Sequence, residues 1–313
     1  MEAKARTHRQ ALETKLILSG NIPLDKSWII RMGVLDLING SDSTLRRLGA
    51  INPKELPDDL RALARASHDW LAGGPVHVGE SGTLYRFLQF VSWKYKLGKT
   101  FVKEGTLRER EICNNPDIVN WPIEKLGALD EGTSQWKSAA AIAGSLERQS
   151  NPEPKLQLTY EAIRHWEERK REGNAWLVRY DDTLIRQAVS FIQFIQTGKM
   201  EFEPLHAEDY CFARAFELIT REEGQRRWKQ LSEHESDRLE EMEDELKNFR
   251  EGRRIMSRDH RVVQAIAMLA WAQGKKAEIA HPQCVSKSWP QFWGFMAQVS
   301  EFSKQNTFKE QAR

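Results

Sequence analysis

Cysteine is scarce in this sequence and forms no motif. The three cysteines, Cys113, Cys211 and Cys284, lie far apart, and none belongs to a CxxC pair. This spacing excludes a disulfide framework and a structural zinc site. The eight histidines show no paired metal-ligand spacing either. We therefore expect no metal centre, and a reducing, cytoplasmic environment.

Long apolar runs are also missing. The N-terminal segment MEAKARTHRQALETKL lacks the apolar core of a signal peptide, and no later run approaches the roughly 18 apolar residues of a membrane span. Neither sign of charge is in large excess, because the sequence has 47 Lys and Arg and 45 Asp and Glu. The resulting net charge of +2 is too small to attract the whole molecule to nucleic acid or to an anionic membrane. Any use of positive charge must be local.

The sequence does contain strand-like and helix-like segments in alternation. Its 313 residues are enough for two domains, since single cores rarely grow beyond about 250 to 300 residues. Helical spacing of apolar residues predicts helices over 27–38, 57–72, 81–93, 133–149, 156–173, 207–224, 236–252, 259–274 and 289–302. Short apolar runs predict strands over 14–22, 74–79, 175–180, 200–204 and 277–280. The alternation predicts an α/β fold that is rich in helix.

Basic residues stand at predicted helix starts in the N-terminal half. IPLDKSWIIR places Lys26, Ser27 and Arg31 at one such start, and GESGTLYR places Arg86 at another. A helix N-terminus carries unsatisfied amides and the positive end of the helix dipole. A guanidinium one turn further on can hold a carboxylate or phosphate with two hydrogen bonds. Both segments are therefore candidate anion sites, although solvated helix starts of this kind are common.

Three polar segments follow one another in the last third of the chain. HESDRLEEM contains Arg238, DHRVVQAIAM contains Arg261, and PQCVSKSWPQFW contains Lys287. Together these residues could supply several cations to one small anion. The plainer reading is structural: Asp237 and Asp259 are natural helix N-caps, and Lys287 is an ordinary surface lysine.

In this order, the segments resemble the motifs of the 5-enolpyruvylshikimate 3-phosphate synthase family of enolpyruvyl transferases. GTLREREI and GTSQWKSAAAIAGSL resemble two more of its motifs, and AEDYCFARAFELI resembles its Asp-bearing helix. The resemblance implies a two-lobed, inside-out α/β barrel of βαβαββ repeats, reduced here because the chain is short for the family. One lobe would comprise residues 1–22 and 183–313, and the other residues 23–182.

The resemblance also implies a reaction. The enzyme would be a transferase of the shikimate pathway, moving the enolpyruvyl group of phosphoenolpyruvate to a hydroxyl of shikimate 3-phosphate with release of phosphate. The implied catalytic residues are Asp209, Glu235 and Lys26. The implied phosphoenolpyruvate-binding residues are Lys26, Arg86, Arg108, Gln135, Arg238, Arg261 and Lys287. The implied acceptor-binding residues are Ser27, Arg31, Thr133, Ser134, Gln135, Asp209 and His234. No metal or cofactor is required, and the protein would act as a monomer.

The sequence departs from the family pattern mainly where the acceptor would bind. His234 replaces a lysine, and PEPKL stands where the family has Ser-x-Pro-Tyr. Two alternatives stay open: an enolpyruvyl transferase with another acceptor, and a ligand-binding relative without activity. Nucleic-acid binding is a third, resting on eleven tryptophans interspersed with arginines, as in RRW at 226–228. Their place on amphipathic helices favours packing instead.

Overall fold

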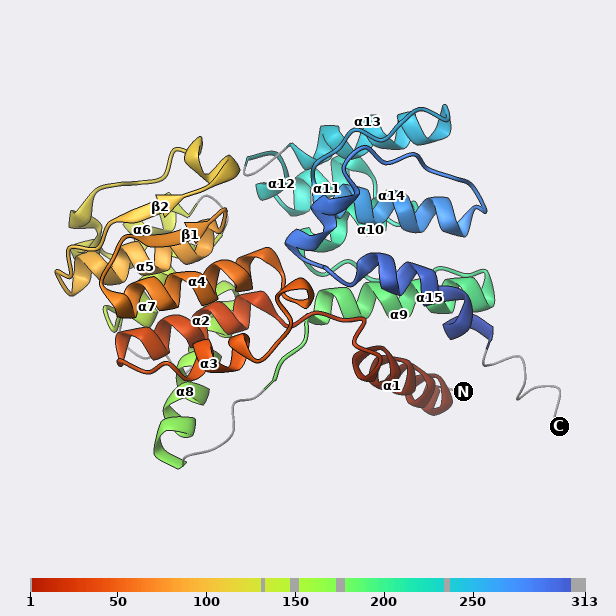
Figure 1. Cartoon of the computed structure of the whole chain (residues 1–313). Coiled ribbons are helices and arrows are strands. Elements are labelled where there is room, and N and C mark those ends of the chain that lie inside the picture. The colour runs from red at the N-terminus through yellow and green to blue at the C-terminus, as the bar shows by residue number, and fades with distance from the viewer. Residues whose placement is uncertain (1, 131–132, 147–151, 173–177, 234–236, 305–313) are drawn as a thin grey trace. The chain divides into compact units, whose positions relative to one another are not determined.

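The computed structural model of this chain describes residues 2–130, 133–146, 152–172, 178–233 and 237–304. The chain divides into two units (Figure 1), each with its own core. Unit 1 comprises Met1–Pro23 and Tyr180–Arg313, and unit 2 comprises Leu24–Arg179. The resemblance implies lobe boundaries after residues 22 and 182. These lie close to the observed unit boundaries after Pro23 and Arg179.

Unit 2 surrounds two apolar helices, α2 (Lys26–Ile38) and α5 (Gly82–Lys94). The others in this unit are α3 (Ser43–Gly49), α4 (Asp58–Ala72), α6 (Ile123–Leu129), α7 (Gln135–Ile142) and α8 (Gln157–Glu172). Short 3₁₀ turns lie at Pro53–Glu55, Gly105–Arg108, Pro116–Asn120 and Pro154–Leu156. Two strands, β1 (Val76–Gly79) and β2 (Phe101–Lys103), pair in parallel with Val76 opposite Phe101.

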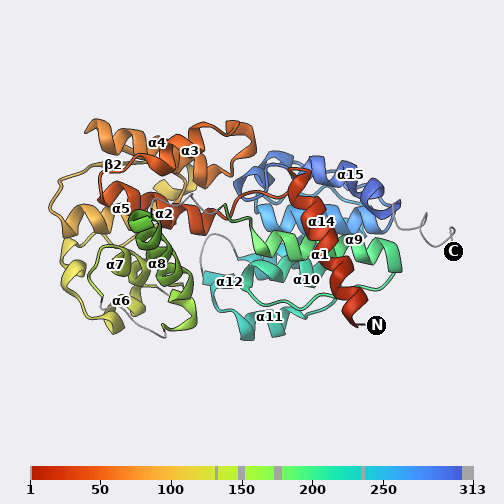
Figure 2. The same ribbon diagram turned by 90° about the horizontal axis from the view of Figure 1, so that it is seen from below.

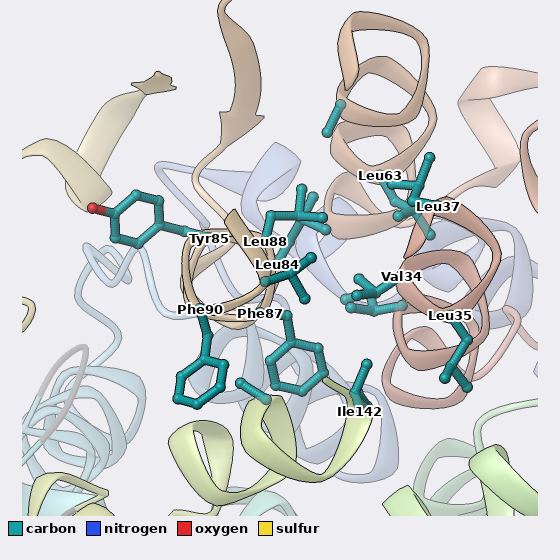
Figure 3. Close-up of a cluster of buried hydrophobic side chains, with 14 of the residues drawn as sticks. Val34, Leu35, Leu37, Leu63, Leu84, Tyr85, Phe87, Leu88, Phe90 and Ile142 are labelled. Carbon is teal, nitrogen blue, oxygen red and sulfur yellow. The ribbon is translucent and has the colours of Figure 1, made fainter. Parts of the chain in front are cut away.

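Helix α2 lies inside the core of unit 2. The side chains of this helix from Trp28 to Leu37 are all buried, and a helix that is apolar on every side must lie inside a core. Figure 3 shows Leu37 of α2 beside Leu63 of α4 and Val34 of α2 pointing toward α5, while Phe87 of α5 points toward Ile142 of α7. Burying each such side chain contributes about 1.5 to 3 kcal/mol.

Unit 1 is built around α14 (His260–Ala272). Its other helices are α1 (Glu2–Leu18), α9 (Asp182–Thr197), α10 (Tyr210–Ala215), α11 (Arg221–Arg227), α12 (Gln230–Glu233), α13 (Arg238–Arg250) and α15 (Phe292–Lys304), with 3₁₀ turns at Ala207–Asp209 and Pro282–Lys287. One side of α14, including Val263, packs with α9 and α15. The other, including Ile266, packs with α10 and α13. Figure 2 shows α1 lying across α9, against which it packs.

The expected inside-out α/β barrel is wrong. The structure is 65% helix and 4% strand, and β1 and β2 are the only strands among the described residues. Ile255 and Ile279 add one isolated bridge. A closed barrel needs a continuous ring of paired strands, which two short strands cannot provide.

The individual strand predictions failed for local reasons. Residues 14–18 continue α1, because Leu12 and Leu16, four residues apart, are both buried. Residues 200–204 belong to no helix or strand. Residues 277–280 form only the bridge at Ile279, and residues 175–177 lie outside the described part. The strand predicted over 74–79 is confirmed as β1.

The predicted helix over 207–224 is interrupted. Glu217 takes a left-handed conformation with φ 59°, and the Leu218 amide donates to the Ala213 carbonyl at 2.9 Å. This pattern closes α10. Thr220 then caps α11, accepting from the Glu223 amide at 3.1 Å. The turn between the two helices creates a cavity that is considered below.

In the described part of the chain, no helix is long and apolar enough to cross a membrane. Of the ten tryptophans in that part, five are buried, and only Trp293 is classed as exposed, at 38%. The tryptophans therefore serve mainly as large packing groups, as their positions on amphipathic helices suggest.

Candidate anion-binding site

Two helix starts meet in unit 1. Asp259 caps α14 by accepting a hydrogen bond from the Arg261 amide at 2.8 Å. Its other oxygen accepts from Nε of Arg238, the first residue of α13, at 2.7 Å. The Ser257 hydroxyl accepts from the Asp259 amide at 3.0 Å. The caps predicted from the sequence are therefore present, and one of them is also half of an ion pair.

The pKa of Asp259 reflects these contacts. Burial alone would raise it, but the charges of Arg238 and His260 and the hydrogen bonds from Arg238 and the Arg261 amide outweigh burial and lower the pKa below its ordinary value. The carboxylate is therefore ionised at neutral pH. It neutralises one of the surrounding cations.

Arg261 is the most informative residue of this group. Its side chain leaves the first turn of α14 and is only 5% exposed, yet its Nη1 has no hydrogen-bond partner among the described residues. A buried donor without an acceptor costs about 1 to 3 kcal/mol, and more when the group is charged. Such an atom marks a place where an acceptor would be stabilised.

Lys287 lies in the same electrostatic neighbourhood. It ends the 3₁₀ turn Pro282–Lys287, which packs against α14. Its charge acts on the Cys284 thiol, as do those of Asp259 and Glu241. We call Arg238, Asp259, Arg261 and Lys287 the α14 cluster. Its three cations outnumber its one carboxylate, so the cluster favours an anion even with Glu241 nearby.

The two neighbouring thiols are not activated. Burial first, then the carboxylates of Asp259 and Glu241, raise the pKa of Cys284 to about 12. Burial also raises the pKa of Cys211, although Arg238 and Arg261 act against it. Both cysteines remain protonated at neutral pH and are poor nucleophiles.

Asp209, the expected base, is fully engaged. It is completely buried, and one oxygen accepts from Gln187 Nε2 at 3.0 Å. The other accepts from Arg186 Nη2 at 2.9 Å and from the amides of Leu205 and His206 at 2.9 and 3.1 Å. These bonds tie the 205–209 turn to α9. In this arrangement Asp209 is a structural residue.

Two more expected residues, His234 and Glu235, lie outside the described residues. The resemblance implies that His234 binds the acceptor and that Glu235 transfers protons.

Unit 2 contains a second group of expected residues. Arg86, in the second turn of α5, donates to the Gln135 amide oxygen at 2.8 Å, and its guanidinium lies 5.9 Å from the Trp136 ring centroid. Gly82 is flanked by two guanidiniums, because a Cβ placed there would lie 2.9 Å from Arg86 Nη1 and 3.2 Å from Arg110 Nη1. We call Arg86, Arg110 and Gln135 the α5 cluster.

The sequence interpretation missed Arg110. Its guanidinium donates to Thr106 at 3.1 Å, and the loop that carries it follows β2. Arg108, chosen instead, is exposed and donates to the Lys103 carbonyl at 2.9 Å. The signal was present in the pair of arginines two residues apart. Which of them turns toward α5 depends on the fold of the loop.

The start of α7 is already capped. Asp130 accepts from the amides of Trp136 and Lys137 at 2.7 and 3.1 Å. Burial raises the pKa of Asp130, partly offset by these hydrogen bonds. The expected ligands Thr133 and Ser134 donate to the carbonyls of Asp130 and Lys155, both at 2.8 Å. Their hydroxyls stabilise the chain before α7.

The basic residues of α2 also have internal roles. Lys26 pairs with Asp59 at 2.8 Å. Arg31 is buried and donates to Thr159 at 2.8 Å and to the Ser27 carbonyl at 2.8 Å. Burial lowers its pKa to about 10, against the opposing charge of Asp25. Arg31 links α2 to α8.

The structure thus separates the expected residues into two kinds. Arg238, Arg261 and Lys287 gather in unit 1, and Arg86 and Gln135 gather in unit 2. Within these groups Arg238 pairs with Asp259 and Arg86 with Gln135. The other expected residues that the structure describes bond elsewhere in the protein, Ser27 through its backbone carbonyl: Lys26, Ser27, Arg31, Arg108, Thr133, Ser134 and Asp209. Among the described residues, no group of three or more His, Cys, Asp and Glu side chains could hold a metal ion.

Comparison with known proteins assigns this chain to no family. No protein-family model, no curated protein and no solved structure matches this chain.

Proposed function

We propose that this protein binds phosphoenolpyruvate and transfers its enolpyruvyl group to a hydroxyl of a phosphorylated acceptor such as shikimate 3-phosphate. The observation that supports donor binding most directly is Arg261, 5% exposed, whose Nη1 has no acceptor among the described residues. A carboxylate oxygen would satisfy that donor with a charge-assisted hydrogen bond.

The charges of the α14 cluster suit the groups of this donor. The carboxylate of phosphoenolpyruvate would lie against Arg261, beside the pair formed by Arg238 and Asp259 at 2.7 Å. The phosphate would lie toward Lys287, since an ammonium group is a mobile point charge that suits a leaving phosphate. Preorganised cations of this kind stabilise the charge that develops on phosphate as it leaves.

The proposed reaction forms one bond and breaks another at C2. The acceptor hydroxyl loses its proton as its oxygen adds to C2, and C3 takes a proton, which gives a tetrahedral intermediate. The C2–O bond to phosphate then breaks, and C3 returns its proton, which restores the double bond. We assign proton transfer to Glu235, which lies outside the described residues. Asp209 would have to exchange its internal hydrogen bonds first.

In unit 2, the α5 cluster would hold a phosphate group in its own right. Arg86 and Arg110 both lie beside Gly82, where the absence of a side chain lets the two guanidiniums approach the backbone. The Gln135 amide, now hydrogen-bonded to Arg86, would become an additional donor. This cluster is a separate candidate site for a phosphate-bearing ligand within unit 2.

A second candidate function is ligand binding without catalysis. The full hydrogen bonding of buried Asp209 favours it, and so does the loss of the barrel that the enzyme family uses. In that case the α14 cluster would bind phosphoenolpyruvate and release it unchanged.

Calorimetry and a phosphate-release assay separate the two candidates. Phosphoenolpyruvate should bind with a heat that Arg261→Gln abolishes and Arg258→Gln leaves unchanged, since Arg258 is an exposed arginine three residues earlier. Phosphate released from phosphoenolpyruvate and shikimate 3-phosphate supports the transferase. Binding without release supports the second candidate, and absence of binding refutes both.

We also place this activity in the cytoplasm. All three cysteines are free thiols in the structure, as a reducing compartment would keep them. Phosphoenolpyruvate itself would have to be supplied there.

A further inference from the structure

A second polar pocket lies in unit 1, formed where α10 ends and α11 begins. It is a cavity of about 390 Å³, near the lower end of the range for small-molecule sites, and α13 supplies one side of it. Its charged lining residues are Arg214, Glu217, Arg221, Glu222 and Glu243. We call it the α11 pocket. None of these residues belongs to the α14 cluster.

Two buried donors lack acceptors among the described residues, one on Arg221 in the lining of this pocket and one on Tyr210 behind the lining. Tyr210 is completely buried, and its hydroxyl has no hydrogen-bond partner there; the same holds for Nε of Arg221. Tyr210 packs against the helix that carries Arg221, since a Cβ at Gly224 would lie 2.3 Å from its ring, and the charges of Arg221, Arg214 and Glu243 act on its hydroxyl. Buried donors left unsatisfied are rare, and two together point to an absent acceptor.

The pocket's own charges supply no such acceptor. Glu243 is held by Arg214 through two hydrogen bonds of 2.6 and 2.8 Å. Glu240, outside the lining, pairs with Nη2 of Arg221. The remaining lining carboxylates are Glu217 and Glu222. An anion alone would satisfy Arg221 and Tyr210 but would be repelled by these two carboxylates.

Glu217 is held at a position that glycine would favour. Its φ of 59° lies in the left-handed region, where a side chain other than glycine or asparagine is uncommon. The pKa of Glu222 is lowered by hydrogen bonds from its own amide and from Thr220, so this carboxylate is charged at neutral pH. Glu217 lies 3.9 Å from Arg250 Nη2 in a pair whose side chains are both more than half exposed, so both carboxylates can receive a cation.

We propose that the α11 pocket binds a small zwitterion, an α-amino acid. Its carboxylate accepts from Tyr210 and from Nε of Arg221, and its ammonium group lies between Glu217 and Glu222. The side chain of Arg221 is 35% exposed, so it can swing aside, exchanging Glu240 for the incoming carboxylate. The site is separate from the proposed enolpyruvyl transfer and does not depend on it.

The test is calorimetry on the full chain with the twenty amino acids singly, followed by derivatives of the best ligand. At least one amino acid should bind saturably. Its N-acetyl and amide derivatives, each lacking one charge, should bind at least about tenfold more weakly. Inorganic phosphate and putrescine supply one charge sign each and should not bind here.

Matched variants show whether the heat of amino-acid binding comes from the α11 pocket. Tyr210→Phe and Arg221→Gln should each weaken binding about tenfold or more, whereas Arg226→Gln, an exposed arginine on the same helix, should not. Arg261→Gln should also leave it intact, which separates this site from the α14 cluster. Circular dichroism verifies folding; should Tyr210→Phe misfold, the Arg221 and Arg226 variants decide.

Three results would overturn the proposal. They are no binding by any amino acid at millimolar concentration, equal binding of the N-acetyl or amide derivative, and full binding by both the Tyr210 and the Arg221 variant.

Discussion

The Arg238 guanidinium and the Asp259 carboxylate lie 2.7 Å apart and join the first residue of α13 to the N-cap of α14. The Asp259 side chain is 4% exposed, and that of Arg238 is 19% exposed. An ion pair this well covered responds strongly to the loss of one partner, because the other charge is left buried and unpaired.

Asp259→Asn isolates the charge from the cap. Asparagine caps helices as well as aspartate does, so α14 keeps its start while Arg238 loses its counterion. We expect the free energy of unfolding to fall by about 3 kcal/mol. Urea denaturation measures it, and Asp237→Asn, at the exposed cap of α13, serves as the control. Equal effects at both positions would show that the pair contributes nothing.

The same pair makes stability depend on pH. The folded pKa of Asp259 lies below the ordinary value of 3.8, so the ionised pair stabilises the fold fully above that value. Its contribution is lost progressively as the pH falls below 3.8 toward the folded pKa. The difference in unfolding free energy between the wild type and Asp259→Asn should therefore shrink on acidification. A constant difference down to acid unfolding would contradict this assignment.

Arg261 should show opposite effects on stability and on binding. Its buried Nη1 has no partner among the described residues and destabilises the protein when no ligand is bound, so Arg261→Met, which keeps a long side chain, should leave the melting temperature unchanged or raise it. Removing such an unsatisfied group is worth about 1 kcal/mol. Phosphoenolpyruvate binding should be lost in the same variant. A variant that loses stability and binding together would indicate a structural role instead.

Tyr210→Phe should likewise stabilise the protein when no ligand is present. The hydroxyl is buried without a partner among the described residues, and phenylalanine keeps the ring. The expected gain is about 1 kcal/mol in unfolding free energy, measured by urea denaturation in amino-acid-free buffer. A loss of similar size would mean that the hydroxyl is satisfied inside the protein.

The sequence predicted helices better than strands for a physical reason. In α4 and α14, apolar residues recur at helical spacing over thirteen or more residues, a pattern that few other structures satisfy. Helix α9 has a similar pattern but was not predicted. The predicted strands were runs of four to nine residues, and such short runs suit a helix end or a loop equally well. Whether they pair depends on distant segments, which a local pattern cannot supply.

The same division applies to the candidate site. Asp259 as an N-cap, and Arg238 and Arg261 at helix starts, follow from local sequence. That Arg238 reaches Asp259, that Arg110 reaches Gly82, and that Asp209 is enclosed by Arg186 and Gln187 are long-range contacts. The break before α11 was visible locally, since Thr220 and Glu223 have the spacing of a capping box.

Gly224 tests the packing beneath the α11 pocket. A Cβ at this residue would lie 2.3 Å from Cε2 of Tyr210, inside contact distance of a ring that is completely buried. A rigid ring in a filled core cannot turn aside as a flexible side chain would, so Gly224→Ala forces the ring or α11 to move. Overpacking of this kind costs about 1 to 3 kcal/mol.

Gly294→Ala is the matched control, because it lies on the exposed side of α15 with nothing within 4 Å of the added Cβ. There alanine should stabilise the helix by about 1 kcal/mol. Unfolding free energies of opposite sign at the two glycines would establish the contact between α11 and Tyr210, whereas stabilisation at both would show that the ring is free to move.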